Sequence, residues 1–210
     1  MEKLTFKKIV KNRKLFIEEH KEEDCYYELK PGSVLVSIPH AINQTRLGKV
    51  KYAEPGSANL GLTLKDKLNC SYIIKTKNNF DDANFDEKSH YREILKYILS
   101  VKGIQYIIDC HSLRKNRDCD INLGIRFGEN IKNNTALYVK LVEKLENAGF
   151  VVKTDEPYYA STRTIAGYVS SMFDVWSIQL EINSKLTNES GNFQRFNEIV
   201  DIIASIFKNI

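Results

Sequence analysis

Residues 103–112 read GIQYIIDCHS, an apolar run that ends abruptly in Asp109, Cys110, His111 and Ser112. A short apolar run rich in β-branched residues is typical of a strand buried in a sheet. Polar and ionisable side chains at the end of such a strand are unfavourable unless hydrogen bonds or a bound group compensate for their burial. The stretch therefore predicts a buried strand with a functional site at its end.

Similar runs occur along the rest of the chain. Short stretches rich in β-branched or aromatic residues predict strands at 33–40, 71–76, 104–109, 121–128, 150–155 and 176–183. Apolar residues at helical spacing predict helices over 91–99, 137–145 and 193–207. This alternation predicts an α/β fold, a three-layer sandwich with a mostly parallel, mixed sheet covered by helices on both faces. The first 30 residues fit either a hairpin or a broken helix.

The composition indicates a folded chain and argues against a nucleic-acid-binding protein. Residues 1–210 are expected to form a single domain, because no Pro-rich, Gly/Ser-rich or repetitive stretch divides them. The chain is 42% hydrophobic and 28% charged, enough for a substantial core and a charged surface. Its net charge of +4 comes from 31 basic and 27 acidic residues that are interspersed, which argues against a nucleic-acid partner.

The N-terminal segment and the cysteines predict the compartment. The first 20 residues are interrupted by charge every few positions, so they form neither a signal peptide nor a membrane span, and a cytoplasmic protein without a membrane partner is expected. Cys25, Cys70, Cys110 and Cys119 form no CxxC pair, and we expect buried or half-buried free thiols.

Two other predicted strands also end in, or carry, ionisable residues. His40 follows the first apolar run, in SIPHAINQ, and Glu181 lies among apolar neighbours in IQLEIN. Ligand sites of open α/β sheets lie beyond the carboxyl ends of the strands. If the strands are parallel, His40, His111 and Glu181 leave the sheet at the same edge.

This set of residue types is the one that a catalytic zinc ion requires. Such a site uses three nitrogen or oxygen ligands from the protein, an open position for water and a nearby carboxylate that accepts the proton of the water. His40 and His111 are the predicted nitrogen ligands. Glu181 is the predicted base, because burial raises the pKa of a carboxyl group towards neutrality.

The sequence leaves three candidates for the oxygen ligand. Asn43, Glu54 and Asp82 all follow the first predicted strand, and an amide such as Asn43 is a poorer zinc ligand than a carboxylate. Glu54 precedes a predicted helix and is the ligand that we favour. An acidic residue at that place is also explained by the favourable field of a helix N-terminus alone.

The order of the motifs resembles a known enzyme family. VSIPHA, DDAN, IDCHSL, NLGIRFG, GFVVKTDEPYYAS and IQLEIN occur in the order and approximate spacing of the N-formylglutamate amidohydrolase family, which is similar to the wider zinc carboxypeptidase and aspartoacylase group. The resemblance spans roughly residues 33–185. It implies a phosphorylase/hydrolase-like α/β fold, one zinc ion, and hydrolysis of an amide next to a group that carries a carboxylate.

The resemblance also implies roles for single residues. His40 matches the first histidine ligand of the family, and His111 matches the histidine of its DLHS-like element. Glu54 matches an acidic position after the first histidine and is also similar to the acidic ligand of zinc-dependent cell-wall amidases that share this fold. Glu181 matches the glutamate of the QxE-like element. Asp82 and Asn84 match its DxN element, near the substrate.

Further residues are candidate substrate contacts. Asp109 lies two positions before His111, so on a strand both side chains point to one side, and Asp109 either orients a ligand, contacts substrate or caps a loop. Ser112 and Tyr158 are expected to contact substrate, although Tyr158 also fits a core position. Three arginines are candidates to hold a substrate carboxylate or to polarise the scissile carbonyl, namely Arg163, Arg126 and Arg114. We favour Arg163 and Arg126 for catalysis. A surface position without a function is the alternative for each of the three.

The chain departs from the family in loops that would contact the substrate. Ala41 to Asn43 follow His40 where glycine is usual, Phe85 stands where an arginine usually follows the DxN element, and 157–164 reads PYYASTRT where relatives show PYxGG.

The predicted function is therefore zinc-dependent hydrolysis of an N-acyl amino acid or a related small amide. The alternatives are an amidase or peptidase for a peptide or cell-wall stem, and a metal- or ligand-binding relative without turnover.

Overall fold

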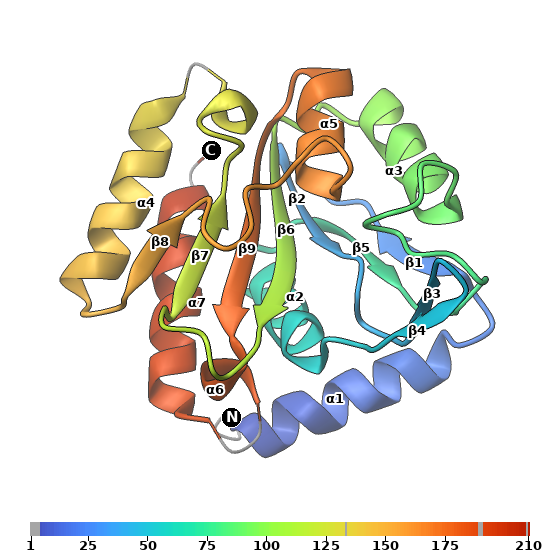
Figure 1. The fold of residues 1–210 in the computed structure, drawn as a ribbon, viewed down its shortest axis with the longest axis horizontal. Helices are drawn as coiled ribbons and strands as arrows, with labels where there is room; N and C mark the ends of the chain where they lie inside the picture. Colours follow the sequence, from blue (N-terminus) through green and yellow to red (C-terminus); the bar gives the residue numbers. More distant parts are fainter. Residues whose placement is uncertain (1–4, 133, 189–190, 209) are drawn as a thin grey trace.

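The fold is built on a mixed β-sheet whose strands lie in the order β1-β5-β2-β6-β9-β7-β8 (Figure 1). The computed structural model describes residues 5–132, 134–188, 191–208 and 210. The strands are β1 (Cys25–Glu28), β2 (Val34–Ile38), β5 (Ser71–Lys75), β6 (Tyr106–Leu113), β7 (Ile121–Gly124), β8 (Val152–Thr154) and β9 (Trp176–Asn183). A separate hairpin pairs β3 (Gln44–Arg46) with β4 (Lys49–Lys51).

The centre of the sheet is parallel and its flanks are mixed. β5, β2, β6 and β9 are parallel to one another, whereas β1 is antiparallel to β5 and β7 is antiparallel to β9. β8 in turn runs parallel to β7. The prediction of a mostly parallel, mixed sheet is confirmed, and the carboxyl ends of β2, β6 and β9 lie at one edge.

Helices cover both faces of the sheet. One face packs against α1 (Phe6–Glu19), α2 (Pro55–Leu68), α4 (Thr135–Asn147) and α7 (Phe193–Phe207), and the other against α3 (His90–Val101) and α5 (Ile165–Phe173). Short helical turns occur at η1 (Glu129–Ile131) and α6 (Ser184–Thr187). The predicted three-layer sandwich is thus confirmed.

The alternation of β9 decides which face of the sheet carries chemistry. Trp176, Ile178, Leu180 and Ile182 belong to the apolar core on the α2 and α7 side. The residues between them are polar and equally buried, and because side chains alternate along a strand they face the α5 side: Ser177, Gln179, Glu181 and Asn183.

Local sequence signals explain where most helices begin. α1, α3, α4, α5 and α7 each start at a Ser, Thr or Asn whose side chain accepts a hydrogen bond from a backbone N–H of the first turn. Such caps satisfy donors that the helix itself leaves unpaired. α2 differs, because Glu54 occupies its N-cap without making a side-chain cap. The carboxylate of Glu54 is therefore available for other partners.

The largest differences from the sequence prediction are at the ends of β6 and β7 and in the N-terminal segment. β6 continues beyond Asp109 to Leu113, because all eight of its residues pair with β9. β7 ends at Gly124, because Arg126 and Phe127 have positive φ values of 51° and 53° and turn the chain away. The N-terminal segment forms the continuous helix α1 followed by β1, rather than a hairpin or a broken helix.

The structure bears on the expectations about membrane-spanning helices and about the cysteines. Among the described residues, none of the helices is both long and apolar enough to span a bilayer. Cys25, Cys70, Cys110 and Cys119 are buried free thiols, as predicted.

Candidate metal centre

The central parallel strands and the start of α2 bring the predicted residues together. His40 follows β2, His111 lies within β6, and Glu181 lies directly opposite His111 in the register of β9. Glu54 reaches the same place from the N-cap of α2, whose first turn approaches β6 closely: a Cβ atom on Gly56 would lie 2.6 Å from the Ser112 hydroxyl. Glycine is required for this approach.

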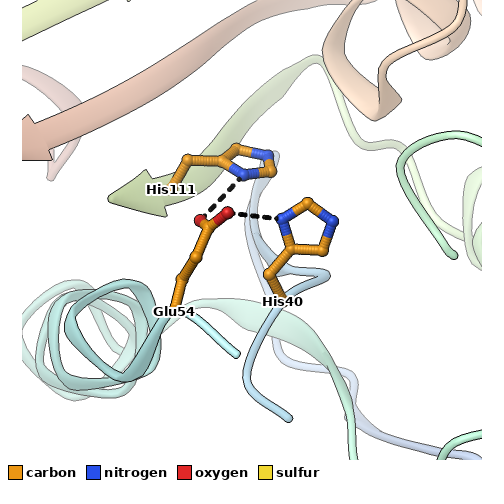
Figure 2. A group of neighbouring side chains, drawn as sticks. All are labelled: His40, Glu54 and His111. Atoms are coloured by element: carbon orange, nitrogen blue, oxygen red, sulfur yellow. Dashed lines mark hydrogen bonds and ion pairs between the residues drawn. The ribbon is translucent and has the colours of Figure 1, made fainter. Parts of the chain in front are cut away.

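The side chains of His40, Glu54 and His111 converge on one point (Figure 2). Glu54 Oε1 lies 2.9 Å from His40 Nδ1, and Oε2 lies 3.3 Å from His111 Nδ1. One nitrogen or oxygen atom from each residue lies within 4.8 Å of the other two. Two imidazole nitrogens and a carboxylate at these separations are the donor set of a catalytic zinc site.

The second nitrogen of each imidazole ring, Nε2, is hydrogen-bonded to a buried carboxylate, as is usual for histidines that bind a metal. His40 Nε2 donates to Asp82 Oδ1 at 3.0 Å, and His111 Nε2 donates to Asp109 Oδ2 at 3.1 Å. Both carboxylates are fully buried. A histidine that donates one N–H to a carboxylate presents its other nitrogen to a metal in a fixed orientation. Asp82 and Asp109 therefore support the ligands from beneath rather than lining the open site.

The charges of these groups stabilise one another. Burial opposes ionisation of Glu54, but the neighbouring His40 and His111 outweigh it and hold the pKa of Glu54 well below its usual range. Burial also disfavours the charged form of His111, but the charges and hydrogen bonds of Asp109 and Glu54 raise the pKa of His111 well above its usual range. Without a metal, the His111 imidazolium and the Glu54 carboxylate thus stabilise each other, and a metal that binds His111 would have to displace its proton.

Asp109 offers a test of this supporting arrangement. Asp109→Asn preserves the volume and an acceptor for His111 Nε2 but removes the negative charge, so zinc affinity is expected to fall by roughly ten- to a hundredfold. Competition with a chromophoric chelator measures the change, with Asp118→Asn, an exposed aspartate that pairs with Lys153, as the control. Equal zinc affinity in both variants would show that Asp109 does not support the ligand.

Glu181 lies beside this cluster in a protected environment. Its side chain is only 5% exposed, and Gln179 Nε2 donates to Glu181 Oε1 at 2.8 Å. Burial, together with the repulsion of Glu54, raises the pKa of Glu181 to about 7, although His111 and Gln179 oppose the shift. A carboxyl group with a pKa near neutrality both accepts and returns a proton readily.

A cleft of about 580 Å³ opens above the cluster. The predicted site residues that line it are His40, Glu54, Asn84, His111, Ser112, Arg114, Tyr158 and Glu181. Asn84 Oδ1 accepts a hydrogen bond from the backbone N–H of Ile165 at 2.7 Å, and Glu54 Oε2 accepts one from the backbone N–H of Ser112 at 3.0 Å. The alternative ligand Asn43 is not among the residues that line the cleft, and its side-chain oxygen accepts from Ala53 N at 2.8 Å.

The two arginines predicted to be catalytic do not line this cleft. Arg126 donates to Ser171 Oγ at 2.7 Å and pairs with Glu129, because its positive φ turns it out of line with β7. Arg163 is exposed, with its guanidinium 5.9 Å from the centre of the Phe85 ring. The structure thus does not bring these two arginines to the predicted metal ligands.

The sequence prediction missed several residues that line the cleft. Arg46, Lys51 and Tyr52 come from the β3–β4 hairpin and its end, and Gln179 comes from β9. The hairpin has a local signal: Leu47 and Gly48 form its two-residue turn, both with positive φ. Lys51 Nζ lies 2.7 Å from Glu54 Oε1, so the hairpin contributes a cation to the ligand cluster itself.

Comparisons with known proteins show which family and which folds this chain resembles. The family model described as FGase, N-formylglutamate amidohydrolase, matches residues 89–187. This segment contains His111 and Glu181, whereas His40 and Glu54 lie before it. A search of curated proteins found no match.

Solved structures resemble the fold over nearly the whole chain. Gene product Atu2144 from Agrobacterium tumefaciens has a TM-score of 0.64 at 14% identity, covering 91% of this chain and 97% of its own. N-formylglutamate amidohydrolase from Ralstonia eutropha JMP134 has a TM-score of 0.59 at 13% identity, covering 89% and 96%. A metallo-carboxypeptidase from Burkholderia cenocepacia has a TM-score of 0.55 at 10% identity, covering 88% and 60%.

These matches test the resemblance that the sequence motifs predict. At such low identity the solved structures establish only the fold, which is that of the metallo-carboxypeptidases. The family model is a match of the amino-acid sequence itself, over residues 89–187. The resemblance of this protein to the N-formylglutamate amidohydrolase family is confirmed over residues 89–187.

Proposed function

We propose that the protein is a zinc-dependent amidohydrolase that cleaves an N-acyl amino acid or a related small amide. The observation that carries this proposal is the convergence of His40, Glu54 and His111 at the floor of an open cleft, with Glu181 in register beside His111. The family match and the metallo-carboxypeptidase fold support the same class of reaction.

His40 Nδ1, His111 Nδ1 and the Glu54 carboxylate would hold the ion. Bound there, zinc would supply positive charge that polarises a carbonyl and makes a water molecule more acidic. The imidazole rings are oriented in advance by Asp82 and Asp109, so the ligands lose little freedom when a metal binds. The residues present therefore suit the metal that the fold implies.

Glu181 is the proposed proton acceptor. It takes a proton from the water that attacks the amide carbonyl carbon and returns it to the nitrogen of the leaving amine as the C–N bond breaks. The products are a carboxylic acid and an amine, so no further reactant is needed. Gln179 positions Glu181 by donating to its Oε1 atom, so Oε2 is the atom proposed to take up the proton.

The lining of the cleft favours a substrate with negative charge. Three cationic residues border it, namely Arg46, Lys51 and Arg114, and Tyr52 and Tyr158 add aromatic surface. Basic groups in a cleft attract and orient anionic ligands. A small amide that carries a carboxylate, such as an N-acyl amino acid, matches this lining.

Hydrolysis by the full chain loaded with zinc tests the proposal. We expect release of the free amino acid from at least one member of a panel of N-formyl and N-acetyl amino acids, with a turnover number on the order of 1 to 1000 per second for the preferred substrate. The released amine is measured by derivatisation, and protein treated with a chelator is the control. A zinc-loaded protein that hydrolyses no member of the panel would contradict the proposal.

A further inference from the structure

The β3–β4 hairpin places one arginine at the cleft in an unusually constrained way. Arg46 is the last residue of β3 and lines the cleft. Its Nε donates to Asp82 Oδ2 at 2.6 Å, and its guanidinium carbon lies 5.1 Å from the centre of the Phe85 ring. One edge of the guanidinium is thus held by a buried carboxylate, and one face lies against an aromatic ring.

The backbone around Arg46 is fixed to the same loop. Gln44 is fully buried, and its Oε1 accepts from Ala83 N at 2.8 Å. Thr45 N donates to Asp81 O at 3.2 Å. These bonds join β3 to residues 81–83, so the hairpin and the loop that carries Asp82 hold their relative positions without a ligand. The direction of the Arg46 side chain is therefore set before any substrate arrives.

The outer edge of this guanidinium remains available. Within the described part of the chain its two Nη groups make no hydrogen bond, and the side chain is 36% exposed. The other cations of the cleft differ. Lys51 Nζ is engaged by Glu54 Oε1 and by the carbonyl of Tyr52, and the exposed side chain of Arg114 has no hydrogen-bond partner among the described residues to orient it.

We propose that Arg46 is the specificity-determining residue of the cleft and binds the carboxylate of the amino acid portion of the substrate through both Nη groups. This inference rests on the proposed function and names the part of the substrate that the hairpin recognises. Arginine suits the role because its planar fork matches a carboxylate in a two-point hydrogen bond. Anchoring by Asp82 and Phe85 lowers the entropy that is lost on binding.

A purely structural role for Arg46 would have a different signature. Asp82 connects Arg46 to His40, so an arginine that served only to neutralise Asp82 would affect the metal ligand and not the choice of substrate. Loss of such a role would weaken zinc binding and slow every substrate alike. Loss of carboxylate recognition would instead change the ratio between a charged ligand and its uncharged analogue.

Binding of a matched ligand pair separates the two roles. The probes are N-acetylglycine and N-acetylglycinamide, which differ only in a carboxylate and a carboxamide. Their dissociation constants are measured by NMR titration of the zinc-loaded full chain carrying Glu181→Gln, which prevents turnover. With Arg46 intact we expect the acid to bind roughly ten- to a hundredfold more tightly than the amide, the contribution of a charge-assisted hydrogen-bonded pair.

Substitutions of Arg46 are expected to remove this preference. In Arg46→Met the ratio should fall to about one, and in Arg46→Lys, which keeps a cation beside Asp82 but lacks the fork, the preference should fall severalfold while zinc content stays unchanged. Arg46→Lys decides the question if Arg46→Met loses zinc. Lys49→Met is the matched control, because Lys49 is exposed and lies opposite Arg46 on the same hairpin without lining the cleft.

Two results would overturn the inference. One is a protein with Arg46 intact that binds acid and amide equally well or binds neither, and the other is a preference for the acid that persists in both variants that bind zinc. Failure of the proposed function is a different result. It would appear as an acid preference that depends on Arg46 in a chain that hydrolyses no N-acyl amino acid.

Discussion

Replacing His111 with alanine should remove zinc from the protein. His111 supplies one of three expected ligands, and an average share per ligand of the zinc-binding free energy is about 3 to 5 kcal/mol, or roughly a hundred- to several-thousandfold in affinity. The free chain is expected to carry about one zinc ion and His111→Ala close to none after dialysis. Plasma mass spectrometry of untagged protein measures the metal content.

A second histidine provides the control for this experiment. His90 is exposed and pairs with Asp24 at 2.8 Å at the start of α3, outside the residues that line the cleft. His90→Ala should therefore retain zinc. Circular dichroism of both variants shows whether the fold is kept. One zinc ion per chain in His111→Ala would mean that the cluster at the end of β6 does not hold the metal.

Glu181→Gln should abolish most turnover without removing zinc. Glutamine has nearly the same shape and still accepts the hydrogen bond from Gln179, but it cannot take up a proton. The loss of a positioned general base is expected to lower kcat by roughly a hundred- to ten-thousandfold. Steady-state kinetics on the best substrate of the panel measure this change, and metal content is measured on the same preparation.

The control for Glu181→Gln removes a carboxylate of the same kind from the surface. Glu146 is exposed on α4, on the far side of the sheet from the polar face of β9, and Glu146→Gln should leave kcat unchanged. If Glu181→Gln with full zinc turned over substrate within a few fold of the unmodified chain, Glu181 would not be the base. The proton would then have to be accepted by another group in the cleft.

The sequence was informative about the site wherever the chemistry lies on a strand. The apolar runs before His40, His111 and Glu181 predict strands, and the right-handed parallel arrangement that such alternation favours brings their ends to one edge. The structure agrees, with β2, β6 and β9 adjacent and parallel. Glu54 was predicted from the helix that follows it, and the structure places it between the two histidines.

Residues on loops were placed less well. Arg126 was expected on a strand that ends two residues earlier, and Arg163 was expected to reach the site from a loop whose path the sequence does not determine. Arg46 was missed, although it reaches the cleft from a hairpin with a recognisable turn. Loop backbones depend on distant contacts, such as the bonds of Gln44 to residue 83, and no local pattern contains that information.

By itself the sequence determined the class of fold, the strands that carry chemistry and the residue types that suit a metal, because hydrophobic periodicity and the cost of burying polar groups are local properties. Only the tertiary structure decided the register that sets His111 opposite Glu181, the placement of Asp82 and Asp109 beneath the histidines, and the approach of Arg46 to the cleft. Each of these joins residues far apart in the chain, and such contacts form only when strands pair and helices pack.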